Sequence, residues 1–520
     1  MSAVQVPDSR SAALPAHATT QTQLRARWFW LACLLLSVLV IAPLCLHEYP
    51  GMTDYPNHWA RAQLILDAQQ HRPAHPYFEP RHGLIANLAL DTLVPMFAHA
   101  GIDTNAALKL FAALALLLPV AGVIALAWVL HGGTPWLALL AFALAHSRYV
   151  AWGFLNYFFA IGLALLVFAL WLRLREAHAR IAALALALLG VVVMGAHLMG
   201  FGVLALLVLS HEAWQFWRRR AEPPSERWRP ALPALIALAA CAVVYRLAFE
   251  RGLGFEADWF DTPASKLRNL ISPFMAYDIL PGLAVMALVV GVVSWLWRTR
   301  RLRLAPGWWL TVGLFMLAFV LMPSVIMNSH YVGSRLLIVG ALVFLAVATL
   351  RADRRAQSAV MAVALVATVI RLAEVHKQWA TTSARTAELR QALHAVPVGA
   401  KVATVITIGQ PSYSLHPLRH VASFAIVDRQ AFIPNFFGFP FNGESVAFRP
   451  QAAALAELTN KDQLVYWQDQ PIAWDVFCSH YDAVLVIEQS HKPVLPDCAG
   501  RALSSGRGYA VYPLHGQARP

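Results

Sequence analysis

Charge is scarce in this sequence. Only 13% of its 520 residues are Asp, Glu, Lys or Arg, whereas soluble globular domains carry about a quarter. Hydrophobic residues make up 58% of the chain. This composition excludes a soluble globular protein and predicts a polytopic α-helical membrane protein. The net charge of +13 is then explained by loops that set orientation and meet membrane lipids, so we expect no nucleic acid as a partner.

Several signatures of soluble enzymes are missing as well. The sequence has no glycine-rich phosphate loop, no Ser-His-Asp pattern and no basic-aromatic patch of the kind that binds nucleic acid. Soluble nucleotide-sugar chemistry is therefore disfavoured. Internal repeats are absent too, and cysteine is rare, with five in the whole chain.

Long apolar runs dominate what is present. Eleven of them approach the length of about 17–25 residues that a transmembrane helix needs. They cover residues 28–46, 106–130, 133–147, 154–172, 181–196, 199–216, 231–249, 280–297, 308–327, 336–350 and 356–372. A twelfth run, residues 83–98, carries Asn87 and Asp91, and a central Asp costs about 2.5–3.5 kcal/mol in a bilayer.

The arginine distribution decides how the twelfth run is read. If residues 83–98 do not cross, all the basic clusters fall on one side, as the positive-inside rule demands. These clusters are Arg25/Arg27, Arg173/Arg175/Arg180, Arg218/Arg219/Arg220, Arg298/Arg300/Arg301/Arg303 and Arg351/Arg354/Arg355. We therefore expect residues 83–98 to form a helix along the outer interface, with Asn87 and Asp91 on its wet face.

This topology predicts three parts in a bacterial inner membrane. Residues 1–27 form a cytoplasmic tail, residues 28–372 a transmembrane domain whose first periplasmic loop is 47–105, and residues 373–520 a periplasmic α/β domain. Within the last part, strands are expected at 401–408, 481–487 and 509–512, and a helix at 451–458. Because the periplasm is oxidising, Cys478 and Cys498 are expected to form a disulfide.

The first outer loop holds the densest group of polar residues. Pro56 favours an extended Tyr55, and Asn57 is a suitable N-cap for a helix that would begin at His58. His58 and Arg61 then share one face of that helix, and Asp54 lies a turn before them. Such residues can converge on one outward pocket.

A carboxylate among cations suits group transfer from a phosphate leaving group to a hydroxyl. The carboxylate takes the proton of the acceptor, and cations stabilise the charge that grows on the phosphate. Six basic residues on the outer loops and span ends are candidates to bind that phosphate, namely Arg148, His197, Lys266, Arg268, His330 and Arg335.

Structural and metal interpretations stand beside this one. Asp54 and Asn57 could simply form a self-capped turn. The histidines at 71, 75 and 82 do not have the spacing of a helical zinc-ligand pair. Glu48 with Asp54 could hold a divalent cation, Mg²⁺ or Mn²⁺, by oxygen ligation.

Two motifs carry a family resemblance. The segments Asp54-Tyr55-Pro56-Asn57-His58-Trp59-Ala60-Arg61 and Trp152-Gly153-Phe154-Leu155-Asn156-Tyr157 resemble signatures of bacterial membrane proteins grouped with the GT-C class of glycosyltransferases. An acidic residue after the first span, an interfacial helix and a C-terminal periplasmic domain are similar to that class as well.

The resemblance implies an inverting transferase that uses a polyprenyl-phosphate-linked sugar as donor and a glycan, lipid or protein as acceptor. It gives Asp54 the part of catalytic base and places Arg335, with Arg148 and His197, near the donor phosphate. The pocket would be shaped by five polar residues: His58, Arg61, Asn57, Asn156 and Tyr157. Two alternatives stay open, a transporter or flippase of a lipid-linked saccharide and a non-catalytic envelope-assembly protein.

Overall fold

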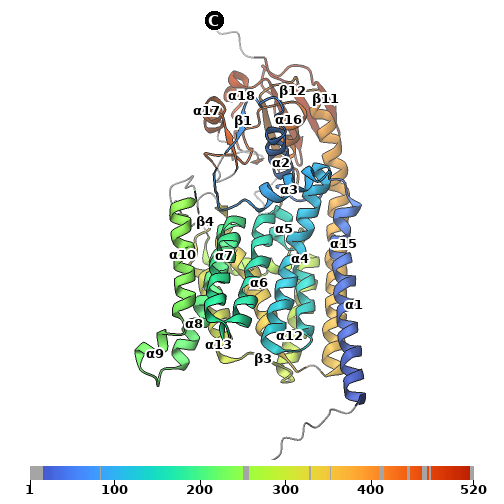
Figure 1. Cartoon of the computed structure of the whole chain (residues 1–520). Helices are drawn as coiled ribbons and strands as arrows, with labels where there is room; N and C mark the ends of the chain where they lie inside the picture. Colours follow the sequence, from blue (N-terminus) through green and yellow to red (C-terminus); the bar gives the residue numbers. More distant parts are fainter. Residues whose placement is uncertain are drawn as a thin grey trace, which may run out of the picture.

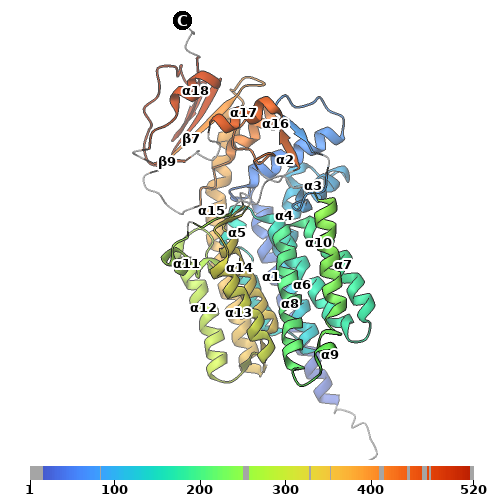
Figure 2. The same cartoon turned by 90° about the vertical axis from the view of Figure 1, so that its left-hand side faces the viewer.

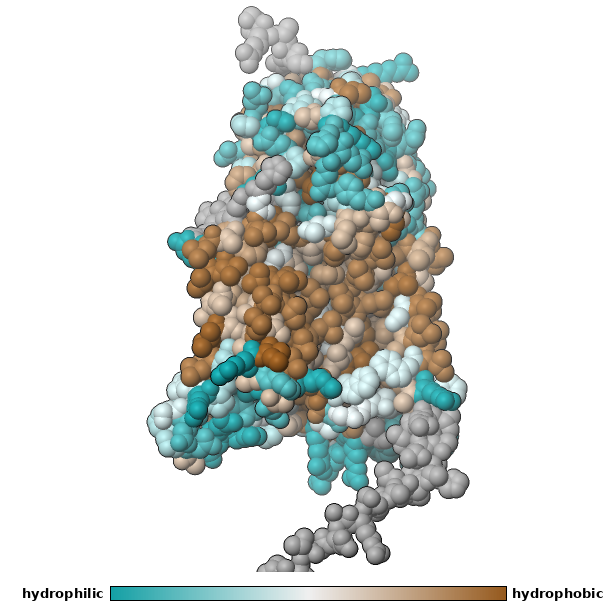
Figure 3. All heavy atoms as spheres, viewed as in Figure 1, coloured by the Kyte–Doolittle hydropathy of each residue, from teal (hydrophilic) through white to brown (hydrophobic). Residues whose placement is uncertain are grey.

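The protein is described by a computed structural model that covers residues 16–81, 83–249, 257–259, 261–326, 329–351, 353–408, 415–441, 445–459, 465–467 and 470–515. A helical bundle carries a smaller domain at one end (Figure 1). On the face shown in Figure 3, a belt of apolar side chains covers the bundle between two hydrophilic ends. The prediction of a polytopic membrane protein with a C-terminal sheet domain is confirmed.

Among the described residues, seven helices are long and apolar enough to cross a membrane, and three apolar helices are shorter. The long ones are α1 (Ala16–Leu46), α4 (Thr104–His131), α6 (Leu155–Arg175), α7 (Ala179–Ala196), α8 (Leu198–Arg218), α12 (Ile279–Arg298) and α15 (Arg354–Leu393). The shorter ones are α10 (Leu232–Ala248), α13 (Pro306–Leu321) and α14 (Val332–Val347).

The expected span at 133–147 is not an α-helix. It forms the 3₁₀ helix η1 (Trp136–Leu144), and the short helix α5 (Arg148–Trp152) follows it. Every residue of η1 is buried. The apolar character of this run therefore reflects packing inside the bundle and not contact with lipid.

Small residues let the central helices approach closely. A Cβ atom at Gly162 of α6 would lie 2.4 Å from Leu118 Cβ of α4, and one at Gly122 of α4 would lie 2.6 Å from Leu165 Cβ of α6. Such close contacts are typical of helix packing in membranes. No hydrophobic effect drives helices together in lipid, so van der Waals contact at small residues stabilises their packing. They hold α6, whose first turn includes the end of the second motif, against α4.

The expected domain boundary after residue 372 lies inside one helix. α15 has 40 residues and runs without a break from the bundle into the C-terminal domain (Figures 1 and 2). The change from apolar to polar residues along it marks where the helix leaves the membrane part and not where it ends.

The C-terminal domain is built on a mixed five-stranded sheet in the order β11-β12-β10-β7-β9. Its strands are β7 (Val402–Ile408), β9 (Val465–Trp467), β10 (Ala483–Glu488), β11 (Ser504–Gly506) and β12 (Tyr509–Pro513). β7 pairs parallel with β10 and β9, and β12 pairs antiparallel with β10. The three predicted strands and the helix α17 (Pro450–Leu458) are present, and so is the disulfide Cys478–Cys498.

The first outer loop is part of the same body as this domain. Its strand β1 (Phe78–Pro80) pairs antiparallel with β8 (Val446–Phe448) of the C-terminal domain. Phe78 is buried among the rings of Phe432, Phe436 and Phe448. The loop also contributes α2 (Tyr55–Gln69) and α3 (Ala89–His99), which pack on each other below the domain (Figure 1).

Short elements complete the described chain. They are α9 (Pro224–Trp228), α11 (Pro263–Asn269), α16 (Phe424–Asp428), α18 (Trp474–His480), η2 (Ser272–Phe274), η3 (Val421–Ser423), β2 (Ala257–Asp258), β3 (Leu302–Arg303), β4 (Val325–Ile326), β5 (Ser329–His330) and β6 (Thr349–Leu350). β3 pairs with β6 at the end of the bundle that lies away from the C-terminal domain (Figure 1).

Candidate active site

The two sequence motifs meet in space. The backbone N–H groups of Thr53 and Asp54 donate to the carbonyl oxygens of Ala151 (3.0 Å) and Trp152 (2.9 Å). His58 Nε2 donates to Gly153 O at 2.9 Å. The turn that ends α5 is therefore clamped onto the loop that begins α2.

Gly153 makes this contact close. Its φ is +103°, and a Cβ atom there would lie 2.8 Å from Asp54 Cβ. Side chains rarely adopt that backbone conformation, and real Cβ atoms rarely approach so near. The glycine thus sets how closely the Trp152–Gly153 turn supports Asp54.

α2 begins earlier than expected. Its first residue is Tyr55, Pro56 lies in its first turn, and Asp54 holds the N-cap position. The prediction of Asn57 as N-cap is wrong, because proline is well tolerated in the first turn, where no N–H is needed. The Asp54 side chain makes no capping hydrogen bond, so its carboxylate is not used to cap the helix it precedes.

Asp54 is a buried carboxyl group among cations. Only 6% of the residue is exposed. Burial raises the pKa of Asp54 to about 7, against the opposing charges of Arg419, Arg335 and Arg61. His420 Nε2 lies 3.6 Å from Asp54 Oδ1. A carboxyl group that ionises near neutral pH is suited to accept a proton.

Arg335 lies in the first turn of α14 and is buried. Its guanidinium covers the ring of Phe154 at 3.7 Å and donates from Nη2 to His330 O at 2.6 Å. Tyr157 holds the same turn, because its hydroxyl donates to Arg335 O at 2.7 Å. Two residues of the second motif thus fix a cation that acts on Asp54 electrostatically.

His197 and Arg148 lie on neighbouring elements. His197 joins α7 to α8, and its Nδ1 accepts from Met199 N at 3.1 Å. Burial and the charge of Arg335 lower the pKa of His197 to about 3, so this imidazole is neutral and can donate from Nε2. Arg148 begins α5, where the next residue, Tyr149, donates its hydroxyl to Ser334 O at 2.5 Å.

The expected pocket residues of α2 bind other parts of the protein. Arg61 Nε donates to Asp91 Oδ1 at 2.7 Å, and both side chains are buried. The expectation that Asp91 faces water is therefore wrong, because its charge is compensated by Arg61 inside the protein. Asn57 Oδ1 accepts from Ser423 Oγ and from Phe437 N, each at 3.2 Å.

Asn156 ties α6 to the start of α3. Its Oδ1 accepts from Leu90 N at 2.8 Å, and its Nδ2 donates to Asn87 Oδ1 at 2.7 Å. Asn87 thus also has a partner inside the protein. The polar residues of both motifs hold the first loop on the bundle.

The residues considered as metal ligands do not come together as a set. Glu48 is exposed while Asp54 is buried, and the described residues contain no group of three or more His, Cys, Asp or Glu side chains placed to hold a metal ion. His75 Nε2 donates to Ile426 O at 2.9 Å. His82 lies outside the described residues.

Sequence patterns missed the contribution of the C-terminal domain. Arg419, His420, Asn435 and Phe437 all come from this domain and lie around Asp54 or its helix. No local pattern links them to the first loop, which precedes them by more than 300 residues. The adjacent basic residues Arg419 and His420 give a weak signal in the sequence.

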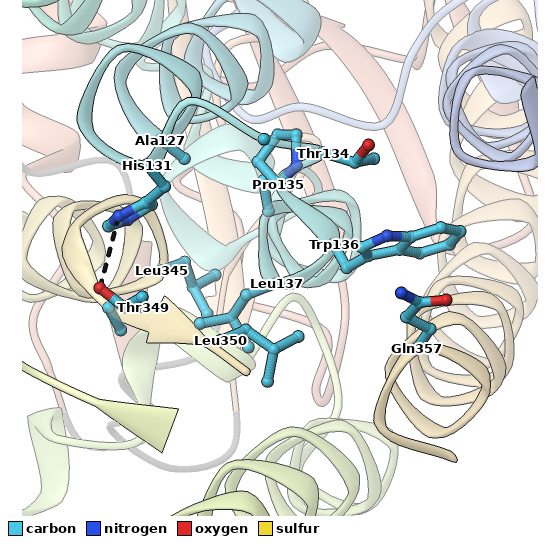
Figure 4. Close-up of a pocket in the computed structure, with 13 residues that line it drawn as sticks. Ala127, His131, Thr134, Pro135, Trp136, Leu137, Leu345, Thr349, Leu350 and Gln357 are labelled. Atoms are coloured by element: carbon cyan, nitrogen blue, oxygen red, sulfur yellow. Dashed lines mark hydrogen bonds between the residues drawn. The ribbon is translucent and has the colours of Figure 1, made fainter. Parts of the chain in front are cut away.

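A cavity of about 290 Å³ lies at the other end of the bundle (Figure 4). Its lining comes from the end of α4, the start of η1, the end of α14 with β6, and Gln357 of α15. His131 Nε2 donates to Ala346 O at 3.0 Å, and Thr349 contacts the same ring. α4 separates this cavity from the loops around Asp54, so it forms no part of the candidate active site.

Comparison with known proteins supports the fold. No protein-family model and no curated protein matches the sequence. The structure is similar to the crystal structure of ArnT from Cupriavidus metallidurans bound to undecaprenyl phosphate, with a TM-score of 0.52 and 13% sequence identity over 94% of this chain and 98% of that one. The expected GT-C-type membrane glycosyltransferase fold is confirmed.

Proposed function

We propose that a chain with this fold is a membrane glycosyltransferase that moves a sugar from a polyprenyl-phosphate-linked donor to an acceptor hydroxyl. One observation carries the proposal: Asp54, a buried carboxyl group with a pKa of about 7, lies within electrostatic reach of the buried cation Arg335. The reaction needs a base that accepts the proton and a cation that binds the phosphate, and here the two groups lie near each other.

In this reaction Asp54 accepts the proton of the acceptor hydroxyl while its oxygen attacks the anomeric carbon of the donor sugar. The bond between that carbon and the phosphate oxygen breaks, and the polyprenyl phosphate leaves with the electron pair. The acceptor oxygen and the leaving phosphate lie on opposite faces of the sugar, so one displacement inverts the anomeric centre. The proton on Asp54 later passes to water.

The donor phosphate is assigned to Arg335, with Arg148 and His197 beside it. Arg335 is held rigidly by Phe154, Tyr157 and His330, so little reorganisation is needed when charge grows on the leaving group. His197 supplies an N–H from a neutral ring. ArnT, which shares the fold, was crystallised with undecaprenyl phosphate, and this supports a lipid phosphate as the donor's carrier.

The remaining motif residues are assigned to the pocket wall. His58, Arg61, Asn57, Asn156 and Tyr157 each bind another part of the protein and thereby keep the acceptor pocket in shape. We place the reaction at the outer face of a bacterial inner membrane. The arginine-rich loops would then lie in the cytoplasm, as positive-inside topology requires.

The proposal is tested with purified protein in lipid nanodiscs and a panel of undecaprenyl-phosphate-linked sugars. Release of undecaprenyl phosphate is measured with candidate acceptors, both with EDTA and with added Mg²⁺ or Mn²⁺, which also decides whether turnover needs a divalent cation. We expect Asp54→Asn to lose roughly a hundred- to ten-thousandfold in turnover.

Asp67→Asn is the matched control, since Asp67 belongs to the same helix but pairs with Gln63 and Arg72 near its far end. Equal turnover by folded Asp54→Asn and by the wild type would remove Asp54 from catalysis. Movement of a labelled lipid-linked saccharide across proteoliposomes, without release of lipid phosphate, would favour the flippase alternative.

A further inference from the structure

We propose that His420 of the C-terminal domain is a positioning residue that holds Asp54 by directing its Nε2–H at the carboxylate, with Asn435 fixing the ring. The inference rests on the proposed function, in which Asp54 is the base. It assigns the C-terminal domain a direct part in the active site.

The tautomer of His420 follows from its contacts. Asn435 Nδ2 donates to His420 Nδ1 at 3.0 Å. A ring nitrogen that accepts a hydrogen bond carries no hydrogen, so a neutral imidazole keeps its proton on Nε2. That nitrogen lies 3.6 Å from Asp54 Oδ1, just beyond the length of a hydrogen bond, so the N–H attracts the carboxylate electrostatically and a shift of a few tenths of an ångström would complete the bond. All three residues are buried, with 5%, 5% and 6% exposure for His420, Asn435 and Asp54.

The segment that carries His420 is fixed on the helix that carries the first motif. Phe437 packs edge-on against the His420 ring, with the centroids 4.9 Å apart. The backbone N–H of Phe437 and the hydroxyl of Ser423 both donate to Asn57 Oδ1. Asn57 thus bridges the two sides of the His420 segment, and this explains its presence three residues after Asp54.

The ionisable groups near Asp54 and His420 come from three elements. Arg419 and His420 belong to the C-terminal domain, Arg61 and His58 to α2, and Arg335 to α14, and the three arginines are the cations that act on Asp54. Burial, with the charges of Arg419 and His58, lowers the pKa of His420 well below its ordinary range. His420 is therefore a neutral donor beside a carboxylate and not its salt-bridge partner.

In this arrangement the two oxygens of the carboxylate have different roles. His420 faces Oδ1 at 3.6 Å, and the proposal leaves Oδ2 to the hydroxyl of the acceptor. A donor aimed at the ionised form also favours that form. Loss of the donor should both misplace the base and make it harder to ionise.

The test measures Asp54 directly by pH-difference infrared spectroscopy, with the band of the protonated carboxyl assigned by its absence in Asp54→Asn. His420→Phe keeps the ring packing and removes the N–H, whereas His420→Gln keeps a donor. We expect His420→Phe to raise the ionisation midpoint by about one pH unit, a tenfold change in the ionisation constant, and His420→Gln to stay near the wild type.

His75→Phe is the matched control. His75 also lies between the first loop and the C-terminal domain and donates to a backbone carbonyl, but it does not face Asp54. Equal midpoints for wild type and His420→Phe, or an equal shift in His75→Phe, would overturn the inference. So would identical midpoints for the Phe and Gln variants, since a purely structural role does not depend on the donor.

The same variants are assayed for turnover of the undecaprenyl-phosphate sugars. We expect His420→Phe to lower kcat roughly ten- to a hundredfold with little change in KM, and the acid limb of its pH profile to move to higher pH. The two readouts separate the proposals. Absence of turnover in all forms contradicts the proposed function alone, whereas unshifted infrared midpoints contradict the role of His420 even in an active enzyme.

Discussion

The burial that raises the pKa of Asp54 and suits it to accept a proton also makes its ionised form destabilise the folded protein. Its pKa of about 7 in the folded protein lies above the value of 3.8 expected for an unperturbed Asp. Between these two values the folded state binds the proton more strongly than the unfolded chain. The contribution of Asp54 to stability is therefore full below about pH 4 and is lost as the pH rises through about 7.

Asp54→Asn should accordingly stabilise the protein at alkaline pH while it removes turnover. We expect its Tm to exceed that of the wild type by an amount that grows from pH 4 to pH 7 and is constant above. Thermal unfolding in detergent across this range measures the effect, with Asp67→Asn as the control. A Tm difference that does not change with pH would contradict the raised pKa.

Single residues stand out in the sequence where the signal is local. The density of polar residues in the first outer loop points to Asp54, and positions on outer loops and span ends point to Arg335 and His197; their roles stay predictions. Asp91 was placed in water because an isolated acid in an apolar helix suggests a wet face. Its partner Arg61 lies 30 residues away in sequence, and no periodicity reveals such a pairing.

At the scale of elements, the turn between α5 and α6 supports the site through one glycine. We expect Gly153→Ala to lower turnover by about a hundredfold, because its Cβ would displace Asp54 and small misplacements of a reacting group are costly. Gly132→Ala is the control, since Gly132 also has a positive φ but no neighbour within 4 Å. Kinetics and Tm are measured for both. If the two variants lose turnover equally, backbone strain and not the contact with Asp54 is responsible.

A second element, α15, is anchored where it leaves the bundle. Glu374 accepts from Tyr277 N and Asp278 N at 2.8 and 2.7 Å and pairs with the buried Arg371. We expect Glu374→Gln to lower the free energy of unfolding by about 3–5 kcal/mol, since a buried arginine loses its counter-charge. Glu388→Gln, which breaks an exposed pair on the same helix, should change it by no more than about 0.5 kcal/mol. Similar Tm values for the two variants would contradict this account.

Elements were predicted well by hydropathy but not in their exact form. The run at 133–147 gives no sign that it adopts a 3₁₀ helix, because apolar composition does not distinguish helix types. In α15 the switch from apolar to polar residues suggested a domain boundary after residue 372. Composition changed there because the surroundings change from bundle to domain, while the backbone hydrogen bonds continue.

At the scale of the whole molecule, the arginine pattern predicted the order of crossings and grouped the C-terminal domain with the first loop. The contact between the loop and the domain confirms the grouping, and the order of crossings stays a prediction. The pairing of β1 with β8 was beyond the sequence, because a three-residue strand has no detectable pattern. The site itself is composite, and its C-terminal half was missed for that reason.

The orientation of the molecule is tested through its disulfide. In protein isolated without reductant, we expect Cys478 and Cys498 to resist alkylation, and to react with a membrane-impermeant maleimide from the periplasmic side only after reduction. Cys33 and Cys241, which are buried, serve as internal standards that react only after unfolding. Ready alkylation of both cysteines without reductant would contradict the disulfide. Labelling that requires access from the cytoplasm would reverse the topology.

We expect the unbroken α15 to make the protein sensitive to the thickness of its membrane. A helix of 40 residues is about 60 Å long, twice the hydrocarbon core of a bilayer. Bilayers of different thickness tilt such a helix differently. α15 also packs against η3, which directly follows His420. A tilt of α15 in the membrane would therefore displace His420 in the C-terminal domain. The acyl-chain length of the lipids would then change the distance between His420 and Asp54, and with it the rate of proton transfer to Asp54.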